Sequence, residues 1–306
     1  MIFIDLTVNG LIMGVFYALM AIGLTLIFGI LKIVNFAHGE FYMVGAYAYI
    51  LISTALGLSV WISLPAAVAI GIVIGWVTER TLMSPLYAGY SSWGLMKDEY
   101  AIIVTFGLSL LLINLVDKII GPYPFRGPDL IEASRVEIGP VIANAHRLFA
   151  TGLGLFVIGV VFGFIKFTPW GKQIQAVAQN RLGASLAGID PRKVSSTVFS
   201  LSGGLAAFAG GLLAPMINAS PDVGIFPAIK SYVVVVLGGM GSILGALLAS
   251  LLLGVAESFA AVYLSYNYRD TFGLVVLILV LMFRPQGLFG EKVRSCLLYT
   301  SPSPRD

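Results

Sequence analysis

Charged residues are scarce in this sequence of 306 residues: they make up 11% of it, against roughly a quarter in an average soluble domain. Hydrophobic residues make up 58%, and the mean hydropathy is +0.95. No soluble fold could bury so much apolar surface, so the composition predicts a protein that crosses a membrane several times. The net charge of only +3 gives no electrostatic basis for binding nucleic acid.

Cysteine and histidine are nearly absent as well. The single cysteine, Cys296, excludes an internal disulfide. The two histidines, His38 and His146, lie far apart in the sequence and no H-E-x-x-H motif is present, so we expect no metal site. The sequence also lacks a G-x-S-x-G motif, a P-loop and paired carboxylates at a spacing plausible for catalysis. These absences argue against an intramembrane enzyme, and we expect no cofactor.

Apolar stretches fill most of the sequence, and a stretch of about 20 residues can cross a bilayer as a helix. The stretches are 8–31, 41–60, 61–77, 101–116, 148–167, 194–214, 225–260 and 271–283. The seventh is too long for one span and is interrupted at GGMGS, which divides it into 226–237 and 243–262. The sequence therefore predicts an all-α polytopic bundle of about eight to nine crossings with one or two broken helices.

Lysine and arginine residues between the spans indicate the orientation, because cytoplasmic loops carry an excess of both. The strongest basic bias is in the loop 168–193, which we therefore assign to the cytoplasm; its basic residues are Lys172, Arg181, Arg192 and Lys193. This assignment places the N-terminus outside. Arg284, Lys292 and Arg294 favour a C-terminus inside, which requires the interrupted stretch 225–260 to cross twice or to form a re-entrant half-helix plus a span.

The loop 168–193 has its own helical pattern. Thr168 can cap a helix that has Pro169 at its first position, and Asp190-Pro191 starts the next helix. Gly183 weakens the first helix. Its apolar positions fall on one face: Ile174, Val177, Ala178 and Leu182. An amphipathic helix between two spans either rests on lipid headgroups or docks into a groove of a soluble partner.

Two sets of residues are candidates for a translocation path or gate. Asn35, His38 and Glu40 cluster at the break between the first two spans, where either capping and structural hydrogen bonds or contact with substrate explains them. Gly238, Gly239 and Gly241 allow an irregular backbone at the later break. Glu257 lies in an apolar stretch and is either near the outer interface or buried and paired.

Four stretches together resemble a known family: IFGILKIVNFAHGEFYMVGAY, AVAQNRLGASLAGID, VVVVLGGMGSILGALL and FRPQGLFG. They resemble the branched-chain amino-acid permease family of bacterial ATP-binding-cassette (ABC) importers, in particular its LivH-type membrane subunits. The resemblance covers about residues 1–294, which we expect to form a single transmembrane permease domain. The remaining stretch 295–306, SCLLYTSPSPRD, resembles a translated adaptor or vector sequence, and we expect no function there.

The resemblance implies a subunit of an importer in the bacterial inner membrane that translocates branched-chain amino acids by alternating access. Its partners would be two cytoplasmic ATP-binding subunits, a second related permease and a periplasmic or extracellular binding protein, with ATP hydrolysed only in the partners. The coupling loop would contain Ile174, Val177, Ala178, Asn180, Leu182, Gly188 and Ile189. Related permeases import urea or short amides, which is the alternative substrate class. An ion-coupled secondary transporter would need more acids and bases deep in its spans.

Overall fold

The computed structural model describes residues 2–84, 97–131, 135–138, 141–265 and 268–290. The stretch 295–306, for which we expected no function, lies outside these residues. The described helices are α1 (Ile2–Leu31), α2 (His38–Thr54), α3 (Val60–Thr78), the π-helical turn η1 (Glu79–Met83), α4 (Lys97–Ile119), α5 (Ala145–Phe167), α6 (Pro169–Gln179), α7 (Arg181–Leu186), α8 (Pro191–Leu213), α9 (Ile225–Gly238), α10 (Ile243–Tyr263) and α11 (Arg269–Phe283).

Apolar helices dominate the fold, which confirms the predicted all-α polytopic bundle. Six helices of the described chain are long and apolar enough to cross a membrane: α1, α3 with η1, α4, α5, α8 and α10. The predicted interruption at GGMGS is confirmed, because α9 ends at Gly238 and α10 begins at Ile243. One small hairpin accompanies the helices: β1 (Arg135–Ile138) pairs antiparallel with β2 (Val141–Asn144).

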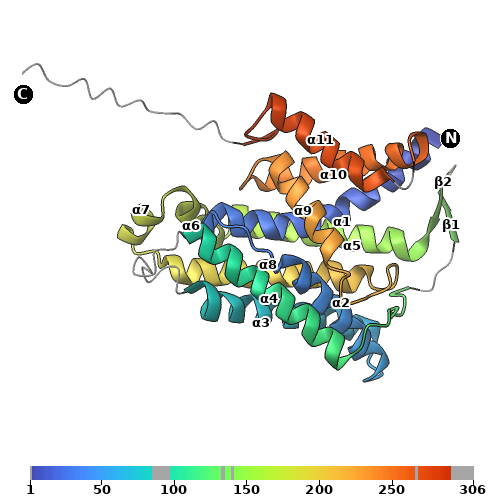
Figure 1. The fold of residues 1–306 in the computed structure, drawn as a ribbon, viewed down its shortest axis with the longest axis horizontal. Coiled ribbons are helices and arrows are strands. Elements are labelled where there is room, and N and C mark those ends of the chain that lie inside the picture. Colours follow the sequence, from blue (N-terminus) through green and yellow to red (C-terminus); the bar gives the residue numbers. More distant parts are fainter. Residues whose placement is uncertain (1, 85–96, 132–134, 139–140, 266–267, 291–306) are drawn as a thin grey trace, which may run out of the picture.

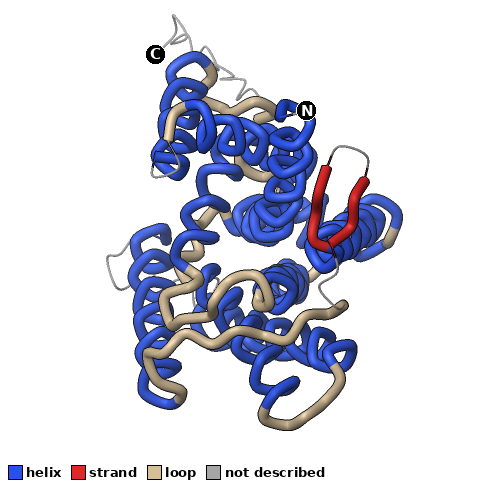
Figure 2. Tube along the Cα trace, turned by 90° about the vertical axis from the view of Figure 1, so that its right-hand side faces the viewer, coloured by secondary structure: helices blue, strands red, loops and turns tan. Residues whose placement is uncertain are grey.

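The bundle has two distinct ends. Helices α6 and α7 lie at one end, the loop end, and the β1–β2 hairpin projects from the other, the hairpin end (Figure 1). Figure 2 is seen from the hairpin end, with the two strands in front. The N-terminal end of α1 lies at the hairpin end (Figure 1). The segment after α11 lies at the loop end, where Leu288 N–H donates to Leu237 O over 2.8 Å. The N-terminus and the last described residues are therefore on opposite sides of the bundle.

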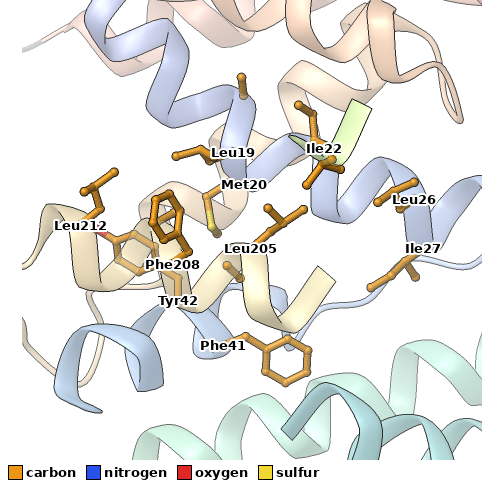
Figure 3. Close-up of a cluster of buried hydrophobic side chains, with 14 of the residues drawn as sticks. Leu19, Met20, Ile22, Leu26, Ile27, Phe41, Tyr42, Leu205, Phe208 and Leu212 are labelled. Carbon is orange, nitrogen blue, oxygen red and sulfur yellow. The ribbon is translucent and has the colours of Figure 1, made fainter. Parts of the chain in front are cut away.

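The core lies where α1, α2 and α8 meet. Figure 3 shows side chains from all three helices packed together, among them Leu19, Phe41, Tyr42, Leu205 and Leu212. Most of the central parts of α1 and α8 are buried, whereas α3, α4 and α5 expose most of their apolar surface. Helices α1 and α8 therefore form the centre of the bundle. Helices α3, α4 and α5 form the outer surface that a bilayer or another membrane subunit would cover.

Helix α2 begins halfway through the bundle and not at its surface. After α1 ends, Lys32 takes a φ of 56° and the chain turns back along α1. His38, the first residue of α2, lies beside Met20 in the middle of α1 and Ser202 in the middle of α8. The helix predicted at 41–60 is therefore shorter than expected and ends at Thr54. The non-helical segment 32–37 forms the rest of this crossing.

Helix α9 begins at a similar depth. Gly224, directly before α9, lies against the backbone of Gly39 in α2. From there α2 runs along α8 to the hairpin end, and α9 runs along α1 to the loop end. The N-termini of these two helices, of 17 and 14 residues, thus meet inside the bundle, a form of broken helix that is tolerated where protein surrounds the backbone.

The helices in the two halves of the chain pack in a similar arrangement but run in opposite directions. Helix α1 packs antiparallel along α10, and α3 packs antiparallel along α8. Helix α2 packs on α8, just as α9 packs on α1. The set α1–α4 therefore corresponds to the set α8–α11 in inverted orientation, although no internal repeat is recognisable in the sequence.

Glycines allow the closest of these contacts. A Cβ atom on Gly14 of α1 would lie 2.8 Å from Leu251 Cα in α10, and one on Gly71 or Gly75 of α3 would meet the backbone of α8. Gly159 of α5 has the same four-residue spacing in sequence, to Gly163, but a Cβ there would meet no atom within 4 Å. The pairs Gly10/Gly14 and Gly71/Gly75 therefore act as close-packing seams between helices, whereas Gly159/Gly163 does not.

Candidate functional site

The residues around the start of α2 form a buried polar cluster. Asn35 Oδ1 accepts a hydrogen bond from Ala37 N–H over 3.1 Å and closes the turn that leads into α2. His38 Nε2 lies 3.0 Å from the carbonyl oxygen of Met20, which can only accept, so this nitrogen carries the proton. His38 Nδ1 is left as the acceptor for Ser202 Oγ, 3.5 Å away. His38 therefore anchors the tip of α2 to α1 and α8.

Helix α4 leans on the tip of α2 through a narrow strip of small residues. Ala101, Thr105 and Ser109 are spaced by four and are buried, whereas most other residues of the helix are exposed. Ser109 Oγ donates to Glu40 Oε1 over 2.7 Å, and Phe36 N–H donates to Thr105 Oγ1 over 3.2 Å. These two hydrogen bonds attach an otherwise lightly packed helix to the polar cluster.

Three aromatic side chains, one of them from α9, pack beside the cluster. Tyr232 OH donates to Asn35 O over 2.6 Å, and its ring lies 5.8 Å from the ring of Phe36. Phe36 in turn makes an edge contact with Phe106 of α4, with 6.5 Å between the ring centroids. Segments from four elements therefore converge at this site, halfway through the bundle: the turn before α2, α2 itself, α4 and α9.

Two polar atoms of the cluster are buried without a hydrogen-bond partner within the described part of the chain. They are Asn35 Nδ2, a donor, and Glu40 Oε2, an acceptor. Leaving such a group buried and unpaired costs about 1–3 kcal/mol. The site can therefore accept one hydrogen bond and donate another to a polar molecule.

The other predicted set lies elsewhere. Gly238, Gly239 and Gly241 form the turn between α9 and α10 at the loop end, where Gly241 lies against Gly29 near the end of α1. Gly239 has a φ of 100° and packs on Gly290 of the C-terminal segment. The structure thus brings Asn35, His38 and Glu40 together and places the glycine turn apart from them.

The loop 168–193 folds as predicted at its start. Thr168 Oγ1 accepts from Gly171 N–H over 3.0 Å, and Pro169 is the first residue of α6. The helix ends earlier than expected, however, because Asn180 stops α6 and caps α7 by accepting from Gly183 N–H over 2.9 Å. The single apolar face is therefore divided: Ile174 and Val177 are buried, Ala178 is half-buried, and Leu182 is exposed.

Helix α7 presents its apolar side chains outwards. Leu182 and Leu186 are 72% and 82% exposed. The helix is closed by Gly188 at φ 83°, whose N–H donates to Ser185 O, and by Ile189 N–H, which donates to Ala184 O. Asp190 Oδ1 then accepts from Arg192 N–H at the start of α8. Capping at both ends makes α7 a well-defined short helix with an exposed apolar face.

A buried ion pair joins α9 and α10 through Glu257 and a partner that the sequence analysis did not identify. Lys230 Nζ contacts Glu257 Oε1, both side chains are buried, and Tyr17 OH of α1 donates to Glu257 Oε2 over 2.8 Å. The buried, paired interpretation of Glu257 is thus confirmed. Lys230 itself was missed, although a single lysine inside an apolar run is a signal of a functional or paired charge.

Comparison with known proteins identifies the family. Residues 6–281 match the family model described as the permease component of the branched-chain amino acid transport system. The chain belongs to this family. The permease is 34% identical to the high-affinity branched-chain amino acid transport system permease protein LivH of Salmonella typhimurium, over 94% of this chain and 96% of that protein.

Two further relatives have related names. BraD of Pseudomonas aeruginosa, a permease protein of the same kind of system, is 35% identical over 93% of this chain and 94% of its own. LivM of Escherichia coli, also named as a permease protein of a high-affinity branched-chain amino acid transport system, is 27% identical over 92% of this chain and 69% of its own. No solved structure matches the permease. The matched family region contains the α2 cluster, α6, α7 and the Lys230–Glu257 pair.

Proposed function

We propose that the chain is the membrane-spanning permease subunit of an ABC importer for branched-chain amino acids: leucine, isoleucine and valine. The observation that carries this proposal is the similarity to LivH and BraD over almost the full length of both proteins. Both relatives are named as permeases of high-affinity branched-chain amino acid transport. The chain would act in the bacterial inner membrane with the loop end in the cytoplasm.

The proposed partners follow from the same similarity. A second permease of the LivM type would complete the membrane part, since the chain resembles LivM as well as LivH. Two ATP-binding subunits would dock at the loop end, and a binding protein would deliver the amino acid at the hairpin end. The permease itself would then be non-catalytic, and ATP hydrolysis would take place in the partners.

We assign the docking of an ATP-binding subunit to α7. Its apolar side chains Leu182 and Leu186 are exposed in a polar, basic segment, and an apolar helix face of this kind fits a groove on a soluble partner. Ile174 and Val177 of α6 would then transmit the movement, because both are buried in the main core. Asn180, Gly188 and Ile189 would hold α7 at a fixed angle to α6 and α8.

We assign the translocation path to the region at the tip of α2. This region contains buried polar groups halfway through the bundle, and polar groups at such a depth are typical of a substrate path. The second permease would cover it, so that the path runs between the two permeases. The glycine turn at Gly238, Gly239 and Gly241 would lie at the cytoplasmic mouth of the path, where it could act as a gate.

Uptake by the reconstituted complex tests the proposed function. Proteoliposomes containing the permease, its genomic-neighbour permease and ATP-binding subunits, and the binding protein would be given labelled leucine or urea, with and without ATP on the cytoplasmic side. We expect ATP-dependent uptake of leucine. Urea uptake would change the substrate class, and uptake driven by an ion gradient without ATP would overturn the assignment to ABC importers.

A further inference from the structure

The unpartnered atoms of the α2 cluster have opposite hydrogen-bonding character. Glu40 Oε2 accepts and Asn35 Nδ2 donates; Glu40 lies in the first turn of α2, and Asn35 lies three residues before the helix. Their residues are 4% and 0% exposed, so bulk water does not reach these atoms in this conformation. A buried carboxylate oxygen of this kind needs a cationic or strongly polar partner.

Hydrogen bonds within the cluster already fix the remaining polar atoms. Ser109 occupies Glu40 Oε1, Ala37 N–H occupies Asn35 Oδ1, and Tyr232 occupies the backbone carbonyl of Asn35. Lys230, a cation of the neighbouring half-helix α9, contacts Glu257 on α10. The side chains of Glu40 and Asn35 are therefore held in place, while one buried atom of each has no hydrogen-bond partner.

We propose that Glu40 Oε2 receives the ammonium group of an α-amino acid in transit, while Asn35 Nδ2 donates to its carboxylate. The inference rests on the proposed function and assigns the residues that contact its substrate. An α-amino acid carries a cationic donor and an anionic acceptor on adjacent carbons, so one molecule can satisfy both unpartnered atoms at once. The positive end of the α2 dipole, at the same place, favours the carboxylate further.

The aromatic side chains beside the cluster suit the rest of such a substrate. Phe36 and Phe106 are 39% and 53% exposed and form an apolar surface next to the polar atoms. A branched aliphatic side chain can pack there while the zwitterion is bound by Glu40 and Asn35. Helix α4 controls access, because Thr105 and Ser109 connect it to the tip of α2 and the helix is lightly packed elsewhere.

Substitution of Glu40 in the complete transporter tests the inference. Glu40→Gln keeps the shape and removes the charge, and we expect uptake of leucine to fall at least about tenfold, as for loss of one charge-assisted hydrogen bond. ATP hydrolysis stimulated by the loaded binding protein should fall less than about threefold. Glu40→Asp should restore part of the uptake. The matched control is Asp117→Asn, the same chemical change at an exposed position of α4, which should leave uptake unchanged.

Two results of this experiment would overturn the inference. Uptake by Glu40→Gln at the wild-type rate would show that Glu40 Oε2 binds only a trapped water molecule and not the substrate. An equal loss of uptake and of stimulated ATP hydrolysis in Glu40→Gln, with no recovery in Glu40→Asp, would show a structural role. If the wild-type complex hydrolyses ATP but imports no leucine, the proposed function itself fails, which is distinct from either result.

A binding measurement separates the ammonium group from the rest of the substrate. The pair of permeases, without the binding protein, would be equilibrated with labelled leucine and challenged with leucine amide, which keeps the ammonium group, or with 4-methylpentanoate, which lacks it. We expect leucine amide to compete at least about tenfold better in the wild type, and this preference to disappear in Glu40→Gln. Equal competition in the wild type would contradict the assignment of Glu40.

Discussion

At the scale of single residues, Gly188 shows how a backbone conformation fixes a proposed contact surface. Its φ of 83° lies in the left-handed region, and its N–H donates to Ser185 O over 3.0 Å to close α7. No atom lies within 4 Å of the position that a Cβ would take, so space does not restrict the residue type here. The conformation alone therefore explains why glycine occupies this position.

We expect Gly188→Pro to abolish ATP-driven uptake while the protein still inserts into the membrane. Proline fixes φ near −65° and has no N–H, so α7 loses its closing turn and its angle to α8. Gly188→Ala should have a smaller effect, since a left-handed alanine costs about 1–2 kcal/mol. Uptake assays and membrane fractionation measure both properties, and normal uptake by Gly188→Pro would contradict a coupling role for this turn.

The buried pair of Lys230 and Glu257 supports a second prediction at this scale. Lys230→Met leaves a buried carboxylate without its cation, which costs about 3–5 kcal/mol, whereas replacing both charges together is nearly neutral. We therefore expect Lys230→Met to lower thermal stability strongly and the double variant Lys230→Met/Glu257→Gln to regain most of it. Glutamine keeps an acceptor for Tyr17 OH.

The two variants and the wild type would be heated in detergent, and size-exclusion chromatography would measure the fraction that remains folded at each temperature. If the double variant were no more stable than Lys230→Met, the two charges would not stabilise each other. If Lys230→Met were as stable as the wild type, the pair would have no structural role in joining α9 to α10.

At the scale of helices, identical sequence spacings have different roles. The pair Gly10 and Gly14 lies in a seam with α10, whereas a Cβ atom on Gly159 or Gly163 would meet no atom of another helix within 4 Å. The sequence cannot distinguish these pairs, because small residues are frequent throughout membrane helices. Only the packing partner, which lies far away in sequence, decides which spacing forms a seam.

We expect Gly14→Leu to separate α1 from α10 and Gly159→Leu to have little effect. A leucine at position 14 would collide with the backbone of Leu251, and overpacking of this kind costs about 1–3 kcal/mol or more. The midpoint of thermal unfolding should fall by about 5–10 °C for Gly14→Leu. A similar fall for both variants would show that general disturbance of the membrane helices, and not the seam, causes the effect.

Much of the helical fold follows from the sequence, and the exceptions have physical causes. The apolar stretches located the spans because a bilayer sets their length. The start of α2 halfway through the bundle was not predictable in this way, since the polar residues around His38 resemble an ordinary boundary between spans. The stop at Asn180 was predictable from a cap signal, because asparagine is a preferred N-cap residue.

The candidate site was predictable only in part. The polar residues Asn35, His38 and Glu40 were found because such residues are unusual in apolar surroundings. Their partners Ser109 and Tyr232 come from helices distant in sequence, and single serines and tyrosines in apolar stretches carry no comparable signal. The exposure of Leu182 and Leu186 likewise depends on how α7 is turned against the bundle, which no local pattern specifies.

At the scale of the whole molecule, the positions of the helix ends define the topology. We infer nine crossings: α1, the segment 32–37 with α2, α3, α4, α5, α8, the segment 215–224 with α9, α10 and α11. This odd number places the N-terminus at the hairpin end and the last described residues at the loop end. It agrees with the basic residues Arg284, Lys292 and Arg294 after the last span.

Labelling of single cysteines tests this topology. In a variant whose only native cysteine, Cys296, is replaced by serine, cysteines introduced at Leu182 and Phe289 should react with a membrane-impermeant thiol reagent only in inverted vesicles. Cysteines at Tyr123 and Asn144 should react only in right-side-out cells or spheroplasts. All four side chains are exposed. Labelling of positions 182 and 289 from opposite sides would contradict the odd number of crossings.

The single helix α5 explains why the two related halves point in opposite directions. The set α1–α4 makes four crossings and returns the chain to the hairpin end, so a second set attached directly to it would insert in the same direction. Helix α5 adds one crossing, and the set α8–α11 therefore starts from the loop end. Helix α5, which has few contacts to the core, thus sets the orientation of everything that follows it. Without α5, the helices α8–α11 would insert into the membrane in the opposite direction.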